Sequence, residues 1–330
     1  MPISKNKSKT FFLPVNTGFS KNQTPDSRCI EFYRERSGNG LHCAIVGNVV
    51  LPSGVGSNNA CSKISKNVAW NALTEAISER GAIPGVQLAS CWPGYKGMQN
   101  FITKSNKKNI NTYREIASSL KEKDIIDAFD DLKLGTSLAA SAGFGHIQLH
   151  AAHGYLFNLI IDSRFSRHVD LAMEKLTEWS DQTADLEVEA SIRLSLATGA
   201  TEIDDYEPND FLDKICTLPI DYIDISSGFY NLNKRLIYPS TDKLLSQRIA
   251  ATTGLAHGHP RRNFIASGKS LKGWTKDLPK NVHIGICRDL IANPEFLKKH
   301  SNGCQNRMKC HYHSRGKDSI TCGKWDTYNQ

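Results

Sequence analysis

The eighteen residues Gly145–Asp162, GHIQLHAAHGYLFNLIID, decide which fold the sequence predicts. They begin with alternating apolar residues, which is the period of a β-strand. Two histidines, His150 and His153, end that strand, and Tyr155 precedes an apolar run typical of a helix start. A strand that delivers titratable side chains at its C-terminal end and then turns into a helix is the arrangement of a barrel active site.

Short apolar segments of this kind alternate with helix-like stretches along the whole chain. The predicted strands are Phe11–Pro14, Cys43–Val50, Gly85–Ala89, His146–His150, Ala190–Ser195, Tyr222–Ser226, Asn263–Ala266 and Val282–Ile286. Apolar spacing predicts helices over Asn67–Arg80, Asp124–Ala142 and Thr241–Thr252. Eight such alternations predict an α/β fold, a (β/α)₈ TIM barrel. The alternative, a doubly wound sheet, would carry a G-x-G-x-x-G cluster after its first strand, and FFLPVNTGF has none.

Length and charge favour one soluble domain over residues 1–330, with residues 301–330 as a C-terminal segment rich in cysteine and histidine. The net charge is +8, and the residues from Arg261 onward hold fourteen Lys and Arg against five Asp and Glu. Long basic runs are missing there, so we expect no nucleic-acid partner. No window approaches the roughly 18 apolar residues of a membrane span, and no secretory signal follows the basic start, so we expect a cytoplasmic protein without a membrane partner.

Polar or glycine residues follow the other predicted strands as well. Those singled out are Pro14, Asn16, Gly47, Gln87, Trp92, Tyr95, Arg193, Gly268, Gly285 and Arg288. Glycines beside Arg288 predict a phosphate cradle, because backbone N–H groups can approach an anion closely there. An inward Arg193 needs an electronegative partner, and an anionic ring system or a phosphate would serve.

Taken in order, these segments resemble the Old Yellow Enzyme group of FMN-dependent NAD(P)H oxidoreductases. The matching segments are FLPVNTGF, EFYRERSGNGLHCAIVGNVVLPSG, GVQLA, HAAHGYL, SIRLS, YIDISSG and IGICRDLIANPEF. The resemblance implies FMN as the cofactor and NAD(P)H as the reductant. The residues that it assigns to the cofactor are Pro14, Asn16, Gly47, Gln87, Arg193, Gly268, Gly285 and Arg288. Gln87 would bond the pyrimidine edge of the flavin, and Arg193 would lie near its N1 side.

The resemblance also implies a reaction on a small electrophilic molecule. His150 and His153 would hold the oxygen of a conjugated carbonyl, hydride would pass from flavin N5 to the β-carbon, and Tyr155 would protonate the α-carbon. NAD(P)H would use the same face in an earlier half-reaction, which gives ping-pong kinetics. After the third strand the sequence departs from the family's His-x-Gly-Arg and reads SCWPGYKG, so we expect Trp92 and Tyr95 to form an aromatic wall of the substrate pocket where other members place polar groups. The oligomeric state is left open, and a homo-oligomer is compatible with the sequence.

A departure from the family's pattern keeps other functions open. The family's N-x-R-x-D-E-Y-G-G-S loop is replaced here by SRHVDLAMEK, in which Asp170 survives and Arg167 or His168 stands in for the arginine. A flavin-binding barrel that has lost catalysis and serves a binding or regulatory role is therefore the alternative function. A metal-dependent barrel hydrolase with His150 and His153 as ligands is a second alternative.

The C-terminal segment contains Cys304, Cys310 and Cys322. Their spacing is C-x₅-C-x₁₁-C, with Arg307 where an iron–sulphur pattern would place another thiolate. Three interpretations stay open: a degenerate cluster site that binds nothing, a zinc or cluster site completed by His311 or His313, and unrelated surface thiols.

Overall fold

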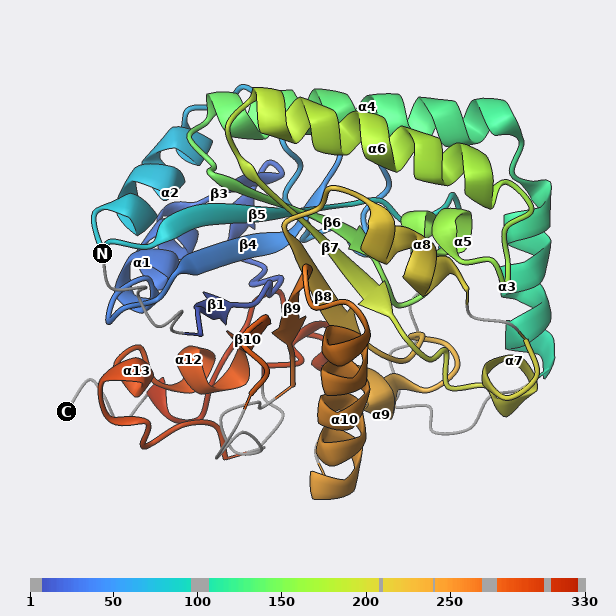
Figure 1. The fold of residues 1–330 in the computed structure, drawn as a ribbon. Helices are drawn as coiled ribbons and strands as arrows, with labels where there is room; N and C mark the ends of the chain where they lie inside the picture. Colours follow the sequence, from blue (N-terminus) through green and yellow to red (C-terminus); the bar gives the residue numbers. More distant parts are fainter. Residues whose placement is uncertain are drawn as a thin grey trace, which may run out of the picture.

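A closed barrel of eight parallel strands forms the centre of the molecule (Figure 1). The computed structural model describes residues 8–95, 107–207, 210–239, 241–268, 278–305 and 310–325. Around the barrel the order is β1 (Thr10–Phe12), β10 (Val282–Ile286), β9 (Asn263–Ala266), β8 (Tyr222–Ser226), β7 (Glu189–Ser195), β6 (His146–Ala151), β5 (Ile83–Ala89) and β4 (Cys43–Val50). Strand β4 pairs with β1 and closes the ring. The predicted (β/α)₈ barrel is confirmed.

Helices connect the strands on the outside of the barrel (Figure 1). They are α1 (Ser27–Arg36), α2 (Ala69–Ser78), α3 (Lys107–Ser119), α4 (Glu122–Ser141), α5 (Leu156–Ile161), α6 (Val169–Asp185), α7 (Thr201–Asp204), α8 (Phe211–Thr217), α9 (Lys234–Ile237), α10 (Asp242–Gly258), α12 (Arg288–Ala292) and α13 (Phe296–Lys299). A short antiparallel pair, β2 (Ser20–Lys21) and β3 (Thr24–Pro25), lies between β1 and α1 in the chain. The three helices predicted from apolar spacing correspond to α2, α4 and α10.

Helix α4 shows how the sequence produces this layer. Its apolar residues Ile125, Phe129 and Leu132 are fully buried and lie three or four positions apart, so they share one face. Burying one such side chain stabilises the fold by about 1.5–3 kcal/mol. Gly135 lies on the same face, where a Cβ atom would come within 2.9 Å of the Leu51 side chain. A side chain at that position would therefore push the helix away from the barrel.

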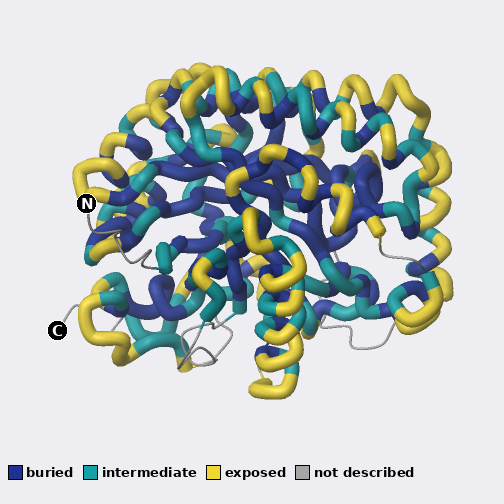
Figure 2. Tube along the Cα trace, in the orientation of Figure 1, coloured by how far each residue is buried: buried dark blue, intermediate teal, exposed yellow. Residues whose placement is uncertain are grey.

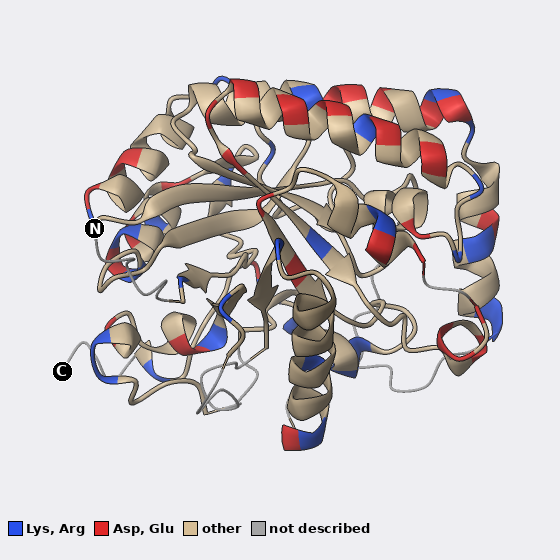
Figure 3. Cartoon of the chain, viewed as in Figure 1, with Lys and Arg blue, Asp and Glu red and all other residues tan. Residues whose placement is uncertain are grey.

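Burial follows the layers (Figure 2): the strands and the inner helix faces are buried, and the outer helix faces are exposed. The exposed faces of α4 and α6 carry interspersed acidic and basic residues (Figure 3). One pair, Lys133 and Glu178, joins the two helices with an N–O distance of 2.8 Å. Among the described helices, none combines the length and apolar character that a membrane crossing requires.

The parallel register sets polar residues side by side near the C-terminal ends of neighbouring strands. Gln87 on β5 pairs with Gln148 on β6, and His150 on β6 pairs with Arg193 on β7. Arg193 in turn pairs with Asp224 on β8. Because all eight strands are parallel, their C-terminal ends meet at one end of the barrel, where enzymes of this fold hold their active sites.

Candidate active site

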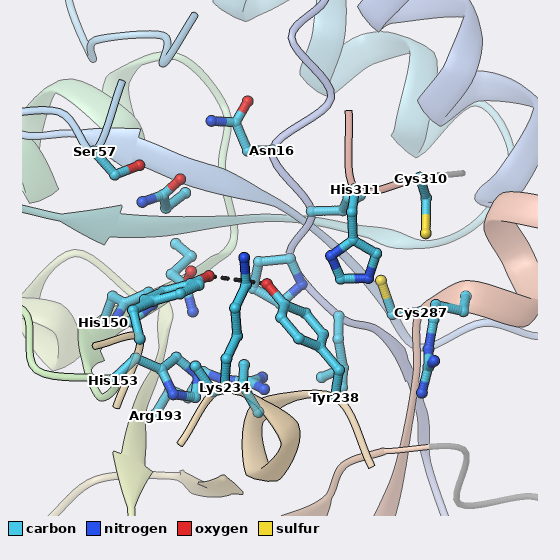
Figure 4. A pocket seen from close by; sticks show the side chains of 18 of the residues that line it. Asn16, Ser57, His150, His153, Arg193, Lys234, Tyr238, Cys287, Cys310 and His311 are labelled. Carbon is cyan, nitrogen blue, oxygen red and sulfur yellow. Dashed lines mark hydrogen bonds between the residues drawn. The ribbon is translucent and has the colours of Figure 1, made fainter. Parts of the chain in front are cut away.

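A cavity of about 280 Å³ lies at this end of the barrel (Figure 4). It brings together most of the residues singled out from the sequence, although they come from distant segments. The predicted site residues that line it are Pro14, Asn16, Gln87, Tyr95, His150, His153, Tyr155, Arg193, Gly268, Arg288 and Cys310. Gly47, Trp92, Gly285, Cys304 and Cys322 do not line it.

Two of these glycines lie in packed positions behind the cavity wall. Gly285 is in β10, where a Cβ atom would come within 2.7 Å of the Leu13 side chain. Gly47 is followed by a cis peptide bond to Asn48, and Asn48 is the residue of this pair that lines the cavity. A Cβ atom on Gly47 would come within 2.9 Å of the Gln87 Cβ atom. Both glycines thus permit close strand packing beside the cavity.

Trp92 also lies behind the cavity wall. Its indole Nε1 donates a hydrogen bond to the Gly154 carbonyl at 3.2 Å. Its ring meets the Tyr95 ring edge-to-face, with the centroids 5.2 Å apart. Tyr95 lines the cavity, so Trp92 supports the aromatic wall from behind.

A buried polar network crosses the floor of the cavity. Gln87 Nε2 donates to Gln148 Oε1 at 2.7 Å, and Gln148 Nε2 lies 3.5 Å from Asp224 Oδ2. Arg193 Nη1 donates to the same Asp224 oxygen at 2.5 Å. Burial raises the pKa of Asp224, and the charge of Arg193 opposes this shift. The network fixes the Gln87 amide and the Arg193 guanidinium where they line the cavity.

The two histidines hold their protons on different nitrogens. A backbone N–H can only donate, and that of Ala152 points to His150 Nδ1 at 3.4 Å, so the proton of neutral His150 belongs on Nε2. A carbonyl can only accept, and that of Gly228 lies 2.9 Å from His153 Nδ1, so the proton of neutral His153 belongs on Nδ1. His150 therefore keeps an Nε2–H donor, while His153 commits its donor to the backbone.

Both histidines are held neutral by their surroundings. Burial, together with the charge of Arg193, lowers the pKa of His150 to about 3. Burial lowers the pKa of His153 well below its ordinary value, and His150 and Arg193 add to the effect. Neutral imidazoles in a cationic pocket serve as hydrogen-bond partners for oxygen and have no second proton to give near pH 7.

Tyr155 lies against His150. The two rings are stacked, with centroids 4.6 Å apart and an interplanar angle of 18°. The Tyr155 ring also stacks with the Tyr230 ring, with centroids 5.8 Å apart. Burial raises the pKa of Tyr155 well above its ordinary value, and a hydrogen bond with Ser57 opposes that shift. Tyr155 therefore carries its hydroxyl proton at neutral pH.

The segment that departs from the expected loop is braced by a buried ion pair. Arg164 Nη2 lies 2.7 Å from Asp162 Oδ2, and Arg164 Nη1 lies 3.1 Å from Asp204 Oδ1. The residues expected to stand in for the family's arginine and aspartate lie on the surface: Arg167 donates to His168, and Asp170 pairs with a lysine of α8. The bracing thus comes from Arg164 and Asp162, which lie three and eight residues before Arg167 and Asp170, together with Asp204 of α7.

Comparison with known proteins relates this arrangement to a known family. Residues 11–172, just under half of the chain, match the family described as NADH:flavin oxidoreductase / NADH oxidase. The resemblance read from the sequence is confirmed, and this similarity supports an oxidoreductase with FMN as cofactor and NAD(P)H as reductant.

Curated relatives and solved structures agree with this assignment. NADPH dehydrogenases from Geobacillus thermodenitrificans (strain NG80-2) and Geobacillus sp. (strain WCH70) are 26% and 25% identical, and each comparison covers 67% of both chains. Old Yellow Enzyme from Pichia sp. AKU4542 superposes with a TM-score of 0.66 at 16% identity, over 91% of this chain and 86% of that one.

Two longer proteins contain the same barrel. The 6-hydroxypseudooxynicotine amine oxidase from Pseudomonas geniculata N1 superposes with a TM-score of 0.72 at 14% identity, over 95% of this chain. A 2-naphthoyl-CoA reductase gives a TM-score of 0.70 at 12% identity, over 96% of this chain. This chain spans 51% and 54% of their lengths, so it corresponds to about half of each.

The cavity of this flavin oxidoreductase fits FMN in its donor chemistry. Gln87 donates one amide N–H to Gln148, and its side-chain carbonyl oxygen can accept a hydrogen bond from an N–H group of the flavin ring. Three guanidinium groups, those of Arg193, Arg248 and Arg288, line the cavity and suit the anionic parts of the cofactor. Gly268 has a φ of +96°, and a Cβ atom there would come within 3.2 Å of Arg248 Nη1. Only a glycine leaves that backbone open beside the cation.

Sequence reasoning missed several residues that line the cavity. They are Ser57, Tyr230, Lys234, Tyr238, Arg248 and Tyr312, and His311 was considered only as a metal ligand. Most lie in segments that follow a strand by several residues, and His311 and Tyr312 come from the C-terminal segment. The run FYNLNKRLIY after β8 carried a usable signal, because polar and aromatic residues gather in a loop that follows a barrel strand.

The C-terminal segment forms part of the cavity wall. Cys310 and His311 line the cavity, whereas Cys304 donates its backbone N–H to Asp289 Oδ1 at 2.7 Å. Within the described ranges, no group of three or more His, Cys, Asp or Glu residues is arranged to hold a metal ion. Arg307 lies outside the described residues. The described residues therefore supply no ligand set for the zinc or cluster interpretations.

Proposed function

We propose that this protein reduces a C=C bond conjugated to a carbonyl group, in two half-reactions that share one cavity. The coarser assignment, a flavin oxidoreductase, follows from the family. Bound FMN would supply reversible storage of a hydride, taken from NAD(P)H and passed to the conjugated alkene. The observation that carries the proposal is the stacked pair His150 and Tyr155, one a neutral N–H donor and the other a protonated phenol.

The cofactor would be held by side chains that the fold fixes before binding. The Gln87 amide and the Arg193 guanidinium are tied through Gln148 and Asp224, so neither has to reorganise. Arg193 would stabilise negative charge on the ring system, as a fixed cation does in a water-poor site. Arg248, Arg288 and the open backbone at Gly268 would hold the phosphate.

His150 would hold and polarise the substrate carbonyl. Its Nε2–H is the available donor, because Nδ1 faces a backbone N–H. A hydrogen bond to that oxygen withdraws electron density from the β-carbon and stabilises the enolate that develops. His153 positions this wall through its bonds to the Gly228 carbonyl and Ser195, since its backbone N–H also donates to Ser195 Oγ at 2.9 Å.

Tyr155 would donate the proton to the α-carbon. Its hydroxyl stays protonated at neutral pH because burial raises its pKa. Ser57 is hydrogen-bonded to Tyr155 and lines the same cavity, so it can return a proton from the cavity to the phenol.

The experiment that tests this function separates the two half-reactions. The purified protein should absorb near 450 nm as flavoproteins do, and NADPH should bleach that band under anaerobic conditions. Tyr155→Phe should leave bleaching by NADPH within about twofold while slowing reoxidation by cyclohex-2-enone by roughly 10²-fold or more. Tyr206→Phe is the matched control, because Tyr206 is 82% exposed on the surface.

Three outcomes would overturn the proposal or replace it. A protein that takes up no FMN contradicts the cofactor assignment. Equal loss of both half-reactions in Tyr155→Phe contradicts the proton-donor role. A protein that binds FMN yet shows no turnover with any enone supports the alternative, a binding or regulatory barrel.

We further propose that residues 301–330 belong to the same domain as the barrel. The support is that Cys310 and His311 line the cavity and that the Tyr312 hydroxyl donates to Asn16 Oδ1 at 3.0 Å. A cytoplasmic location, a homo-oligomeric state and the absence of a nucleic-acid partner stay predictions from the sequence.

A further inference from the structure

The cavity contains a buried lysine that the proposed reaction does not use. Lys234 begins α9, lines the cavity and is only 5% exposed. Figure 4 shows its side chain extending into the cavity beside Tyr238. Burial lowers the pKa of Lys234, as expected for an ammonium group in a water-poor site.

Ring contacts connect Lys234 to the proposed catalytic wall. Tyr155 stacks on His150, and Tyr230 stacks on Tyr155 with centroids 5.8 Å apart. The Lys234 ammonium lies over the Tyr230 ring, 5.8 Å from its centroid. Lys234 is therefore placed two rings away from the residue that would hold the substrate carbonyl.

The lining charge of this cavity favours an anion. Among the described lining residues, four carry a guanidinium or ammonium group, and Asp289 is the only carboxylate. Three of the cations are the arginines assigned above to the cofactor. The fourth, Lys234, also acts on His311, whose pKa falls to about 4 through burial and through the charges of Lys234 and Arg288. Lys234 thus adds a positive charge to its end of the cavity, in addition to the charges of the three arginines.

We propose that the substrate carries a carboxylate in addition to the conjugated carbonyl, and that Lys234 selects for this carboxylate. The inference rests on the proposed function and names its substrate class. An ammonium group has three N–H donors, so it can hold a protein contact and a carboxylate together. In a water-poor cavity such a charge-assisted hydrogen bond is stronger than at the surface.

Tyr95 provides a second, independent indication of a ligand oxygen in this region. Its hydroxyl is buried, has no hydrogen-bond partner among the described residues, and belongs to a residue that is 8% exposed and lines the cavity. The Tyr95 ring meets the Tyr155 ring edge-to-face at 5.3 Å. Burial raises its pKa well above the ordinary value, so it is a donor that lacks an acceptor. A substrate oxygen beside Tyr155 would supply that acceptor.

A pair of probes that differ only in charge tests the proposal by binding. The probes are 3-oxocyclohex-1-ene-1-carboxylate and its uncharged carboxamide, titrated calorimetrically into the oxidised, FMN-loaded protein without NADPH. We expect the acid to bind at least about tenfold more tightly than the amide, as a charge-assisted hydrogen bond provides. The preference should persist in 0.5 M NaCl, because a buried pair is screened less than the field of a protein with net charge +8.

Variants then assign the preference to Lys234. Lys234→Met should reduce the acid-to-amide ratio to about one, and Lys234→Arg should retain part of it. Tyr95→Phe, which removes one hydroxyl, should weaken acid binding by a smaller factor. Lys243→Met is the matched control, because Lys243 is exposed on α10. Equal flavin absorbance across the variants shows that each has folded.

The outcomes distinguish this inference from the proposed function. Equal binding of acid and amide by the unaltered protein overturns the inference, and so does a preference that survives Lys234→Met. Equal weakening of both probes in Lys234→Met would mean a packing role and also overturns it. Acid-selective binding without enone turnover would instead uphold Lys234 as an anion-selecting residue while the proposed function fails.

Discussion

The two ends of the barrel hold histidines in opposite electrostatic surroundings. At the C-terminal end of the strands, His150 and His153 lie near Arg193 and are held neutral. At the N-terminal end, two other histidines share the carboxylate of Glu189. These are His42, with an Nε2–Oε1 distance of 3.0 Å, and His146, with an Nδ1–Oε2 distance of 2.9 Å. The cavity end presents neutral donors, and His42 and His146 at the closed end form ion-pair geometry, although burial lowers the pKa of His283 at that same end to about 4.

This difference follows from position along parallel strands. Glu189 and His146 are the first residues of β7 and β6, so the register places them together at the closed end. Tyr222 begins β8 and donates to Glu189 at 3.3 Å. Polar groups at that end satisfy one another. The cavity end instead leaves the Asp224 Oδ1 and Tyr95 hydroxyl atoms without partners in the described structure, as a ligand site requires.

The largest effect is expected from the buried ion pair under the cavity. Arg193→Met leaves Asp224, which is fully buried, without its closest cation. Removing one partner of a buried pair costs about 3–5 kcal/mol. Urea unfolding of the FMN-free protein should show this loss, and the Kd for FMN should rise.

A double variant separates stability from cofactor binding. Arg193→Met with Asp224→Asn removes both charges, so much of the stability should return. The Kd for FMN should stay high because the guanidinium is still missing. Recovery of normal FMN affinity in the double variant would refute the role given to Arg193.

The next effect is an asymmetry between the two cavity histidines. His150→Gln should slow reoxidation by cyclohex-2-enone by about 10²–10³-fold, the usual result of losing one oxyanion donor. His153→Gln should have a smaller effect, because its Nδ1–H is already committed to the Gly228 carbonyl. Stopped-flow reoxidation at saturating enone measures both. Equal losses would show that His153 also donates to the substrate, as the sequence resemblance implies.

Individual residues show which features of the fold and the site could be predicted from the sequence. The eight strands were predictable because each is a short apolar run, and β6 was predictable down to the histidines at its end. The histidine protons were not, since they depend on the Gly228 carbonyl, 75 residues further along the chain. Lys234 was missed for a similar reason. A lysine in a loop is usually solvated, and only the packing of α9 against the cavity buries this one.

Some residues predicted from the sequence to line the cavity do not line it in the structure. Gly285 and Trp92 follow or end strands, which is the pattern of a site residue. In the structure Gly285 faces Leu13, and the indole N–H of Trp92 donates a hydrogen bond to the Gly154 carbonyl. Strand position therefore predicts which end of the barrel a residue occupies. Whether the side chain faces the cavity or the packing behind it depends on neighbours from other strands.

The smallest effect is expected at the closed end, from Glu189→Gln. Hydrogen bonds to a charged group contribute about 1.5–3 kcal/mol, so the variant should lose stability within that range at pH 7. Because the closed end is separate from the cavity, the Kd for FMN should not change. Glu75→Gln, at an exposed position on α2, is the control. A changed Kd for FMN in Glu189→Gln would mean that the two ends are coupled.

The pH dependence of unfolding should differ between the two ends, because Glu189 and His150 change the stability in different pH ranges. Burial raises the pKa of Glu189, but hydrogen bonds from His146 and His42 outweigh burial and lower it below the ordinary 4.5. Its stabilisation is therefore present above pH 4.5 and is lost as the pH falls further. His150, lowered from 6.5 to about 3, disfavours the folded state once the unfolded chain takes up a proton, so stability falls below pH 6.5.

The two pH ranges are separate because the ordinary pKa values of a glutamate and a histidine differ. Between pH 6.5 and 5, stability should fall by about 1.4 kcal/mol per pH unit for each buried neutral histidine. His150→Gln should flatten that decline. Below pH 4.5 Glu189→Gln should also show a shallower slope, since its closed end no longer has a carboxylate to protonate. A His150→Gln profile as steep above pH 5 as that of the unaltered protein would contradict the neutral state assigned to His150.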